Sequence, residues 1–410
     1  MIRALTAGRA TIRFPGLGEI DVTNLARTML LLPFLLRAAG AAPDPPSYEA
    51  AALGTVLETA QGRLRLVARD ILISNPGTYG IPDEQLHYPW LYESTNGIWY
   101  LTYREGPHHE ARFQSAGNRV RCVQSRDRGK TWLPWLGMKA EPWMYQFFVT
   151  RLADHSLISY RCKMTGLHQS VDASQRPDGT LSGTQILLRS SNAGATWKRS
   201  HVPVSNLPFS LDSALITFWG SAISMPDGRL LWSIITREGR DTRIGVVEST
   251  DGGRSFRFLS SICGPEVYDD VGEPREPAVV LLPRGDLVAV IRCNPMLLVR
   301  SQDGGRTWHE PRKLEAAGPA ICPQLLLLEN GILVCSYGSQ RRRMSVIASW
   351  DGGGRHWTPP LVIYRGETSG YSGLQALGPD RFRVCYQEGS FLNLQSGGNR
   401  LVRVELTTSQ

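Results

Sequence analysis

The octet Ser301-Gln302-Asp303-Gly304-Gly305-Arg306-Thr307-Trp308 recurs along the chain, and its recurrence decides the fold. Residues 125–132 repeat the pattern Ser-x-Asp-x-Gly-x-Thr-Trp, and looser copies begin at Ser190, Ser249 and Ser349. Successive copies begin 65, 59, 52 and 48 residues apart. That spacing suits one four-stranded sheet for each copy.

The residue types in the octet are those of a tight turn. Aspartate accepts hydrogen bonds from nearby backbone N–H groups, glycine supplies a positive φ, and serine or threonine adds local hydrogen bonds. The terminal aromatic side chain can cover the turn against its sheet. The octet therefore predicts a structural module that takes no part in catalysis.

A second repeat precedes each octet and consists of two apolar strands joined by a Gly/Asp turn, which is a hairpin pattern. Its six copies occupy residues 89–103, 147–160, 220–232, 277–290, 323–335 and 372–385. The pattern predicts an all-β fold, a six-bladed β-propeller. The sixth copy lacks an octet, so we expect residues 63–72 to pair with residues 400–406 and close the ring, which removes a sheet edge. We assign residues 55–410 to this single domain.

Residues 1–45 have a different character. Met29–Leu36 is a short apolar run, preceded by Arg27 and followed by small residues, as in a signal peptide. We expect this segment to be signal-like and unstructured, and the protein to be secreted or periplasmic, otherwise cytoplasmic. Elsewhere no apolar run reaches 18 residues, so we expect no membrane span.

Composition narrows the classes of partner. The chain has 410 residues and a formal net charge of +8, but it contains no Lys/Arg block with interleaved aromatic residues. We therefore expect no nucleic-acid partner, whereas a basic surface suits anionic glycans. The seven cysteines are scattered, without metal-like spacing. We expect no metal and no cofactor, and the sequence does not indicate an oligomeric state.

The repeated octet resembles the Asp-box (BNR) repeat of the sialidase (neuraminidase) superfamily, over roughly residues 60–406. Enzymes of this family bind the substrate carboxylate with three arginines. They use a tyrosine nucleophile that is activated by a glutamate, and a separate aspartate as acid and base. Planar guanidinium groups match a carboxylate, and a neutral phenol avoids the repulsion that a carboxylate nucleophile would meet at an anionic sugar.

Five positions match the family's motifs. Glu276, before Pro277, resembles the base, and Tyr371 in Tyr-Ser-Gly-Leu resembles the nucleophile. Arg292 and Arg341 resemble two of the carboxylate-binding arginines, and Arg104 resembles the arginine that contacts a substrate hydroxyl. The resemblance implies that these side chains converge at one mouth of the central channel.

Two positions depart from the family. His87, in His-Tyr-Pro, occupies the place of the first arginine of an Arg-Ile-Pro motif. A protonated His87 would bring a positive charge to the carboxylate only at low pH. The loop after Arg104 holds His108-His109-Glu110 where the family has its aspartate. We therefore assign substrate binding to His87 and His108, and acid–base catalysis to His109 and Glu110.

The resemblance implies a sialidase-like exo-glycoside hydrolase that removes a terminal sialic or related ulosonic or uronic acid by a retaining Tyr/Glu mechanism. One alternative is a hydrolase or lyase for uronate glycans that uses histidine as acid or base. Another is a non-catalytic propeller that binds glycans. A hydrogen bond between Glu276 and Tyr371 would distinguish an enzyme from a binding protein.

Overall fold

The computed structural model describes residues 11–14, 18–21, 49–75, 85–106, 119–138, 147–160, 174–175, 181–207, 214–238, 241–389 and 399–410. The chain divides into two compact units, Met1–Ser47 and Tyr48–Gln410. In the first unit, β1 (Thr11–Phe14) pairs antiparallel with β2 (Gly18–Asp21). The signal-like character of this segment stays a prediction.

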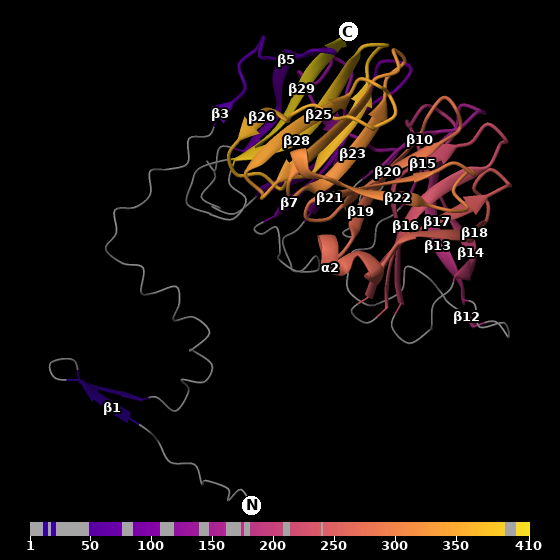
Figure 1. The fold of residues 1–410 in the computed structure, drawn as a ribbon. Helices are drawn as coiled ribbons and strands as arrows, with labels where there is room; N and C mark the ends of the chain where they lie inside the picture. The colour runs from indigo at the N-terminus through magenta and orange to yellow at the C-terminus, as the bar shows by residue number, and fades with distance from the viewer. Residues whose placement is uncertain are drawn as a thin grey trace, which may run out of the picture. The chain divides into compact units, whose positions relative to one another are not determined.

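The second unit is built from strands (Figure 1). The helical elements among its described residues are three single turns, η2 (Pro265–Val267), α2 (Tyr268–Val271) and η3 (Glu315–Ala317). The prediction of an all-β fold is therefore confirmed. None of the described helices is long and apolar enough to cross a membrane.

The described strands of this unit form five sheets. The first contains β6 (Gln85–Glu93), β7 (Trp99–Gly106), β8 (Arg119–Ser125) and β9 (Leu133–Pro134). The largest contains β10 (Thr150–Arg151), β11 (Leu157–Tyr160), β12 (Ser174–Gln175), β13 (Leu181–Ser190), β14 (Lys198–Leu207), β15 (Ala214–Ser224), β16 (Leu230–Glu238), β17 (Asp241–Ser249) and β18 (Phe256–Cys263). In this sheet, β14 and β18 pair in parallel and thereby join two antiparallel groups of strands, one of β10 to β14 and the other of β15 to β18.

The other three sheets follow in chain order. One contains β19 (Arg275–Leu281), β20 (Leu287–Arg292), β21 (Met296–Ser301) and β22 (His309–Leu314). The next contains β23 (Ile321–Leu327), β24 (Leu333–Ser339), β25 (Arg343–Ser349), β26 (Leu361–Arg365) and the short β3 (Glu49–Ala50). The last contains β27 (Ser372–Ala376), β28 (Arg381–Gly389), β29 (Asn399–Ser409), β5 (Gly62–Asn75) and β4 (Val56–Thr59).

The first strand of each antiparallel group contacts the first strand of the next, in the order β10, β15, β19, β23, β27, β6. These strands therefore line a common interior. The two ends of the unit meet in the last sheet, where β5 pairs with β29 along its length, for example Arg69 opposite Val404.

Each octet forms the turn between the last two strands of an antiparallel group. Between β8 and β9, the Asp127 carboxylate accepts hydrogen bonds from Ser125 Oγ at 2.8 Å and from the Thr131 backbone N–H at 2.9 Å. Ser125 Oγ in turn accepts from the N–H of Gly129, which has a φ of 85°. The same contacts recur at Ser249 and Asp251, and at Ser301 and Asp303.

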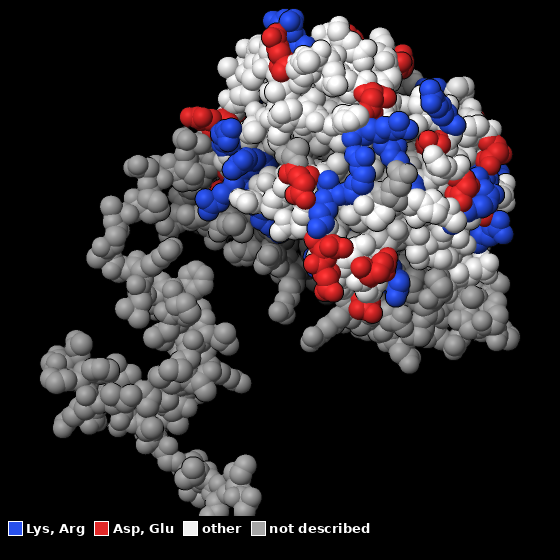
Figure 2. Space-filling model, viewed as in Figure 1, with Lys and Arg blue, Asp and Glu red and all other residues white. Residues whose placement is uncertain are grey.

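Apolar side chains pack between neighbouring sheets, and the largest cluster includes Phe148, Trp219 and Trp232. The described cysteines are free thiols, five of them buried and Cys122 partly buried. On the face in view in Figure 2, lysine and arginine side chains alternate with acidic ones and leave no broad surface of one sign.

Candidate functional site

A bulge at the start of β19 turns Glu276 toward the interior. The pairing of β19 with β20 shifts register between Arg275 and Ala278, and Glu276 there has a φ of 47°. A positive φ is unfavourable for a glutamate, and such strain is found mostly at functional sites. Glu276 is 7% exposed, so its carboxylate must be satisfied by protein groups.

The first strands of two other sheets have the same kind of bulge, at the same end of the strand. Tyr88 in β6 has a φ of 53°, Cys322 in β23 has a φ of 45°, and each precedes a proline, as Glu276 does. Both strands also shift register at this point. The dipeptides Tyr88-Pro89 and Cys322-Pro323 were a sequence signal for these bulges, because proline within a strand pattern marks an edge or a bulge.

Three donors converge on the Glu276 carboxylate. The Tyr371 hydroxyl donates to Oε1 at 2.6 Å, and Arg292 Nη1 donates to the same oxygen at 2.8 Å. The backbone N–H of Cys322 donates to Oε2 at 2.9 Å. These residues come from three sheets, so the packing of the sheets against one another assembles the group.

Tyr371 is buried and is 5% exposed. Its ring packs edge-on against Tyr88, with centroids 4.5 Å apart and planes at 86°. Burial, and then the negative charge of Glu276, raise the pKa of Tyr371 well above its ordinary value, whereas the charge of Arg292 acts in the opposite direction. The phenol is therefore neutral and directs its proton to Glu276.

His87 and Arg104 are cross-strand partners in β6 and β7, and both are buried. Burial, and then the charges of Arg104 and Arg341, together lower the pKa of His87 to about 3. The imidazole of the free protein is therefore neutral at physiological pH. The contact of His87 with a substrate carboxylate stays a prediction.

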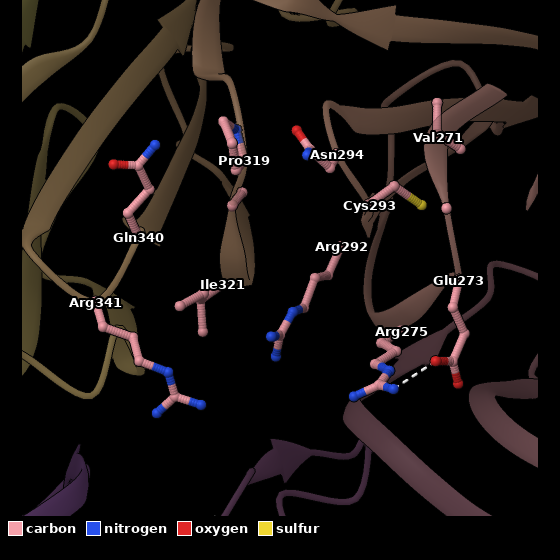
Figure 3. Close-up of a pocket in the computed structure, with 12 residues that line it drawn as sticks. Val271, Glu273, Arg275, Arg292, Cys293, Asn294, Pro319, Ile321, Gln340 and Arg341 are labelled. Atoms are coloured by element: carbon pink, nitrogen blue, oxygen red, sulfur yellow. Dashed lines mark hydrogen bonds and ion pairs between the residues drawn. The ribbon is translucent and has the colours of Figure 1, made fainter. Parts of the chain in front are cut away.

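A cavity of about 520 Å³ opens over the ends of β19, β20 and β23 (Figure 3). Arg292 and Arg341 extend into it, Arg292 from the end of β20 and Arg341 from the turn between β24 and β25. Although burial acts against the charged form, the Glu276 carboxylate raises the pKa of Arg292, which stays ionised. Two guanidinium groups in one cavity suit a carboxylate ligand.

The structure thus joins Glu276, Arg292 and Tyr371 by hydrogen bonds. It brings His87 within electrostatic reach of both Arg104 and Arg341. His108, His109 and Glu110 lie outside the described residues. Sequence reasoning missed the parts played by Tyr88, Cys322 and Arg275, which lines the cavity beside Arg292.

Comparison with solved structures places the fold among known proteins. A protein of unknown function from Dyadobacter fermentans is 18% identical and has a TM-score of 0.56, with 84% of this chain and 99% of that chain covered. The Hadza microbial sialidase Hz136 is 20% identical with a TM-score of 0.53, covering 77% of this chain and 65% of that one. An α-L-arabinanase from Penicillium chrysogenum is 18% identical with a TM-score of 0.55, and the match covers 82% of this chain and 98% of that chain.

No curated protein sequence matches the chain. The family model described as a BNR repeat-like domain matches residues 164–379, which is more than half of the chain. That match agrees with the resemblance in the octets and with the structural neighbours. The chain belongs to the BNR repeat-like domain family.

Proposed function

We propose that the protein is a retaining exo-glycoside hydrolase that removes a terminal acidic sugar, a sialic or related ulosonic or uronic acid, from a glycan. The observation that carries this proposal is the 2.6 Å hydrogen bond from the Tyr371 hydroxyl to Glu276 inside a buried site. A nucleophile and a base within hydrogen-bond reach, beside a third orienting group, are typical of covalent catalysis. Here Arg292 is the orienting group, since it donates to the same carboxylate oxygen.

In the first step, the Tyr371 oxygen attacks the anomeric carbon while its proton passes to Glu276. The bond from that carbon to the leaving oxygen breaks, and we assign the proton that this oxygen takes up to His109 or Glu110. In the second step, water attacks the same carbon and gives a proton to the deprotonated His109 or Glu110. As it attacks, the bond from that carbon to the Tyr371 oxygen breaks, and the oxygen recovers its own proton from Glu276.

The charges around the site suit this chemistry. Forming a phenoxide in a buried pocket is costly, and the neighbouring Arg292 charge lowers that cost because it acts on Tyr371 against the effect of burial. Arg292 and Arg341 face the cavity in which the substrate carboxylate would lie. Two cations from different sheets can fix the acidic group on the side of the sugar that faces the nucleophile.

The architectural part of the proposal is a six-bladed ring. The two groups of the nine-stranded sheet count as two blades and the other four sheets as one each. The pairing of β5 with β29 supports ring closure within the last blade. In such a ring, the bulges at Tyr88, Glu276 and Cys322 all face one mouth of the central channel.

The test is chemical trapping. A glycosyl fluoride of the cleaved acidic sugar, with a second fluorine on the carbon next to the anomeric carbon, should lose the anomeric fluoride and leave the sugar bound to the Tyr371 oxygen. The second fluorine slows hydrolysis of this intermediate. Peptide mass spectrometry would locate the adduct, after a screen of fluorogenic sialosides and uronides has chosen the sugar. An adduct on another residue would refute the assigned nucleophile. Binding of acidic glycans without turnover would favour the non-catalytic alternative.

A further inference from the structure

Three arginines line the cavity beside the proposed catalytic residues, and we assign the substrate carboxylate to two of them, Arg292 and Arg341. The charged residues that line it are Arg275, Arg292, Arg341 and Glu273. Figure 3 shows Arg292 in the middle, with Arg341 on one side and Arg275 on the other. A carboxylate held between Arg292 and Arg341 would leave Arg275 on the outer side, toward α2.

Arg275 is placed there by the strand pairing. It lies opposite Arg292 in the register of β19 and β20, so the two side chains leave the same face of the sheet. Glu273 accepts a hydrogen bond from Arg275, which fixes the guanidinium at the cavity wall. Half of the Arg275 side chain is exposed, whereas Glu276 and Tyr371 are buried. Arg292 links the cavity to this pair, because it lines the cavity and donates a hydrogen bond to Glu276.

Glu273 does not neutralise this end of the cavity. Its carboxylate also lies 3.6 Å from Arg237 and accepts a hydrogen bond from the Thr242 hydroxyl. Two arginines therefore share one carboxylate at the outer end, while Arg292 has Glu276 as its partner at the inner end. The lining of the cavity has three arginines and one carboxylate, so it carries a net positive charge that an anion would complement.

The size and shape of the cavity allow a second sugar. Its volume of about 520 Å³ is more than one sugar ring requires and lies in the range of pockets for drug-sized ligands. Pro319 and Ile321 line the side between Arg341 and Arg292, where the apolar face of a sugar ring can pack.

We propose that Arg275, oriented by Glu273, binds a second anionic group of the substrate, so that the enzyme acts on glycans whose terminal acidic sugar is attached to another acidic sugar. This inference rests on the proposed function for the position of the first carboxylate. It makes Arg275 a residue that determines specificity, without a part in the chemical step.

Calorimetry with paired ligands tests the inference. N-acetylneuraminic acid is compared with its α2,8-linked dimer, and galacturonic acid with digalacturonic acid, using the Tyr371→Phe variant to prevent turnover. We expect the dimer to bind about tenfold more tightly than the monomer, as for one charge-assisted contact. The difference should shrink as salt is added, because the outer end of the cavity is solvated.

Arg275→Gln should reduce this preference to about twofold or less and leave the affinity for the monomer unchanged. The matched control is Arg284→Gln, which removes an exposed arginine from the turn at the other end of the same strand pair and should keep the preference. An Arg275→Gln variant that weakens monomer and dimer equally would overturn the inference, as would a wild-type site that does not distinguish them.

A bromide soak of crystals separates this inference from the proposed function. An anomalous peak between Arg275 and Arg292, lost in Arg275→Gln, would establish the second anion site even if no acidic sugar were cleaved. Cleavage of acidic sugars without such a peak, and without a preference for dimers, would leave the proposed function standing and remove the second site.

Discussion

The Tyr371 hydroxyl and the Glu276 carboxylate are joined by a 2.6 Å hydrogen bond, although 95 positions separate them in the chain. The contact depends on two backbone positions with positive φ, since Gly370 before the tyrosine has a φ of 81° and Glu276 has a φ of 47°. Glu276 lies in β19, the first strand of its sheet, and Tyr371 immediately precedes β27, the first strand of another sheet. The hydrogen bond between them therefore depends on how these two sheets pack against each other.

Replacing Tyr371 by phenylalanine should abolish turnover and preserve the fold. The ring still fills its pocket against Tyr88, but the oxygen that attacks the sugar is gone. Glu276→Gln keeps the shape and removes the base, so we expect kcat to fall by roughly 10²–10⁴-fold. Steady-state kinetics on the sugar selected by the screen, with circular dichroism as the check of folding, measures both variants.

The chain supplies a matched control for this prediction. The Tyr386 hydroxyl donates to Glu388 at 2.7 Å, and burial raises the pKa of that phenol as well. Tyr386→Phe thus removes the same kind of buried hydrogen bond within the last sheet. It should lower the free energy of unfolding by about 1 kcal/mol and leave kcat unchanged. Loss of activity in this variant would mean that Tyr371→Phe reports a general loss of rigidity.

Asp303→Ala should reduce stability without changing the specific activity of the folded protein. The carboxylate accepts hydrogen bonds from Ser301 Oγ, from the backbone N–H groups of Arg306 and Thr307, and from Thr307 Oγ1. Losing these contacts in an exposed turn costs about 1 kcal/mol. Chemical unfolding and kinetics measure the two effects, and inactivity at unchanged stability would contradict the structural role of the octets. Asp127→Ala should behave in the same way.

The same substitution has a predicted pH signature. Against the effect of burial, hydrogen bonds from Thr307 and Ser301 lower the pKa of Asp303 to about 2. An aspartate with a depressed pKa stabilises the fold above its ordinary value near 3.8 and loses that contribution as the pH falls toward 2. The stability gap between wild type and Asp303→Ala should therefore be full at pH 6 and should close between pH 4 and pH 2.

The all-β fold and the turns were accessible from sequence because the octet is a local structure. Asp127 and Ser125 make their hydrogen bonds within a few residues, so the pattern alone implies the contacts. The convergence of Glu276 with Tyr371 came only from the family resemblance, since no local pattern encodes a contact between distant strands. The lowering of the His87 pKa from 6.5 to about 3 could not be predicted from the sequence, because it follows from burial and from two arginines of other segments.

The bulges could be predicted from the sequence only in part. Pro89, Pro277 and Pro323 each follow a residue with positive φ in a first strand, and this repeated strand proline was readable in the sequence. Its meaning required the register shifts, which show that each proline sits at the same end of its sheet. Arg275 likewise stood next to Glu276 in the sequence, but only the register places it opposite Arg292.

Gly370→Ala should impair catalysis more than it impairs stability. Its Cβ would lie 3.0 Å from Ile321 Cβ at a φ of 81°, so the backbone must shift and carry Tyr371 away from Glu276. Gly285→Ala is the matched control, because Gly285 has a φ of 92° and nothing within 4 Å of the added carbon. Both variants should lose about 1–2 kcal/mol of stability from backbone strain, but only Gly370→Ala should lose activity. Equal kinetics in the two variants would show that the position of Tyr371 tolerates the shift.

The last prediction concerns His87, whose buried imidazole makes the protein sensitive to acid. Burial lowers its pKa to about 3 in the folded state, whereas the unfolded chain keeps the ordinary value of 6.5. Between these values the unfolded state binds one more proton, so stability falls as the pH drops, by up to about 1.4 kcal/mol per pH unit. His87→Gln removes this contribution, and its stability should decline less steeply between pH 6.5 and pH 4.5 in urea unfolding.

A bound carboxylate would raise the pKa of His87, but the starting value near 3 keeps the imidazole neutral through most of the range above pH 6. The affinity for an acidic sugar should therefore be nearly constant from pH 6 to pH 8. An affinity that falls tenfold over that range in wild type, but not in His87→Gln, would show that the ligand protonates His87 and that the imidazole contacts the carboxylate as a cation.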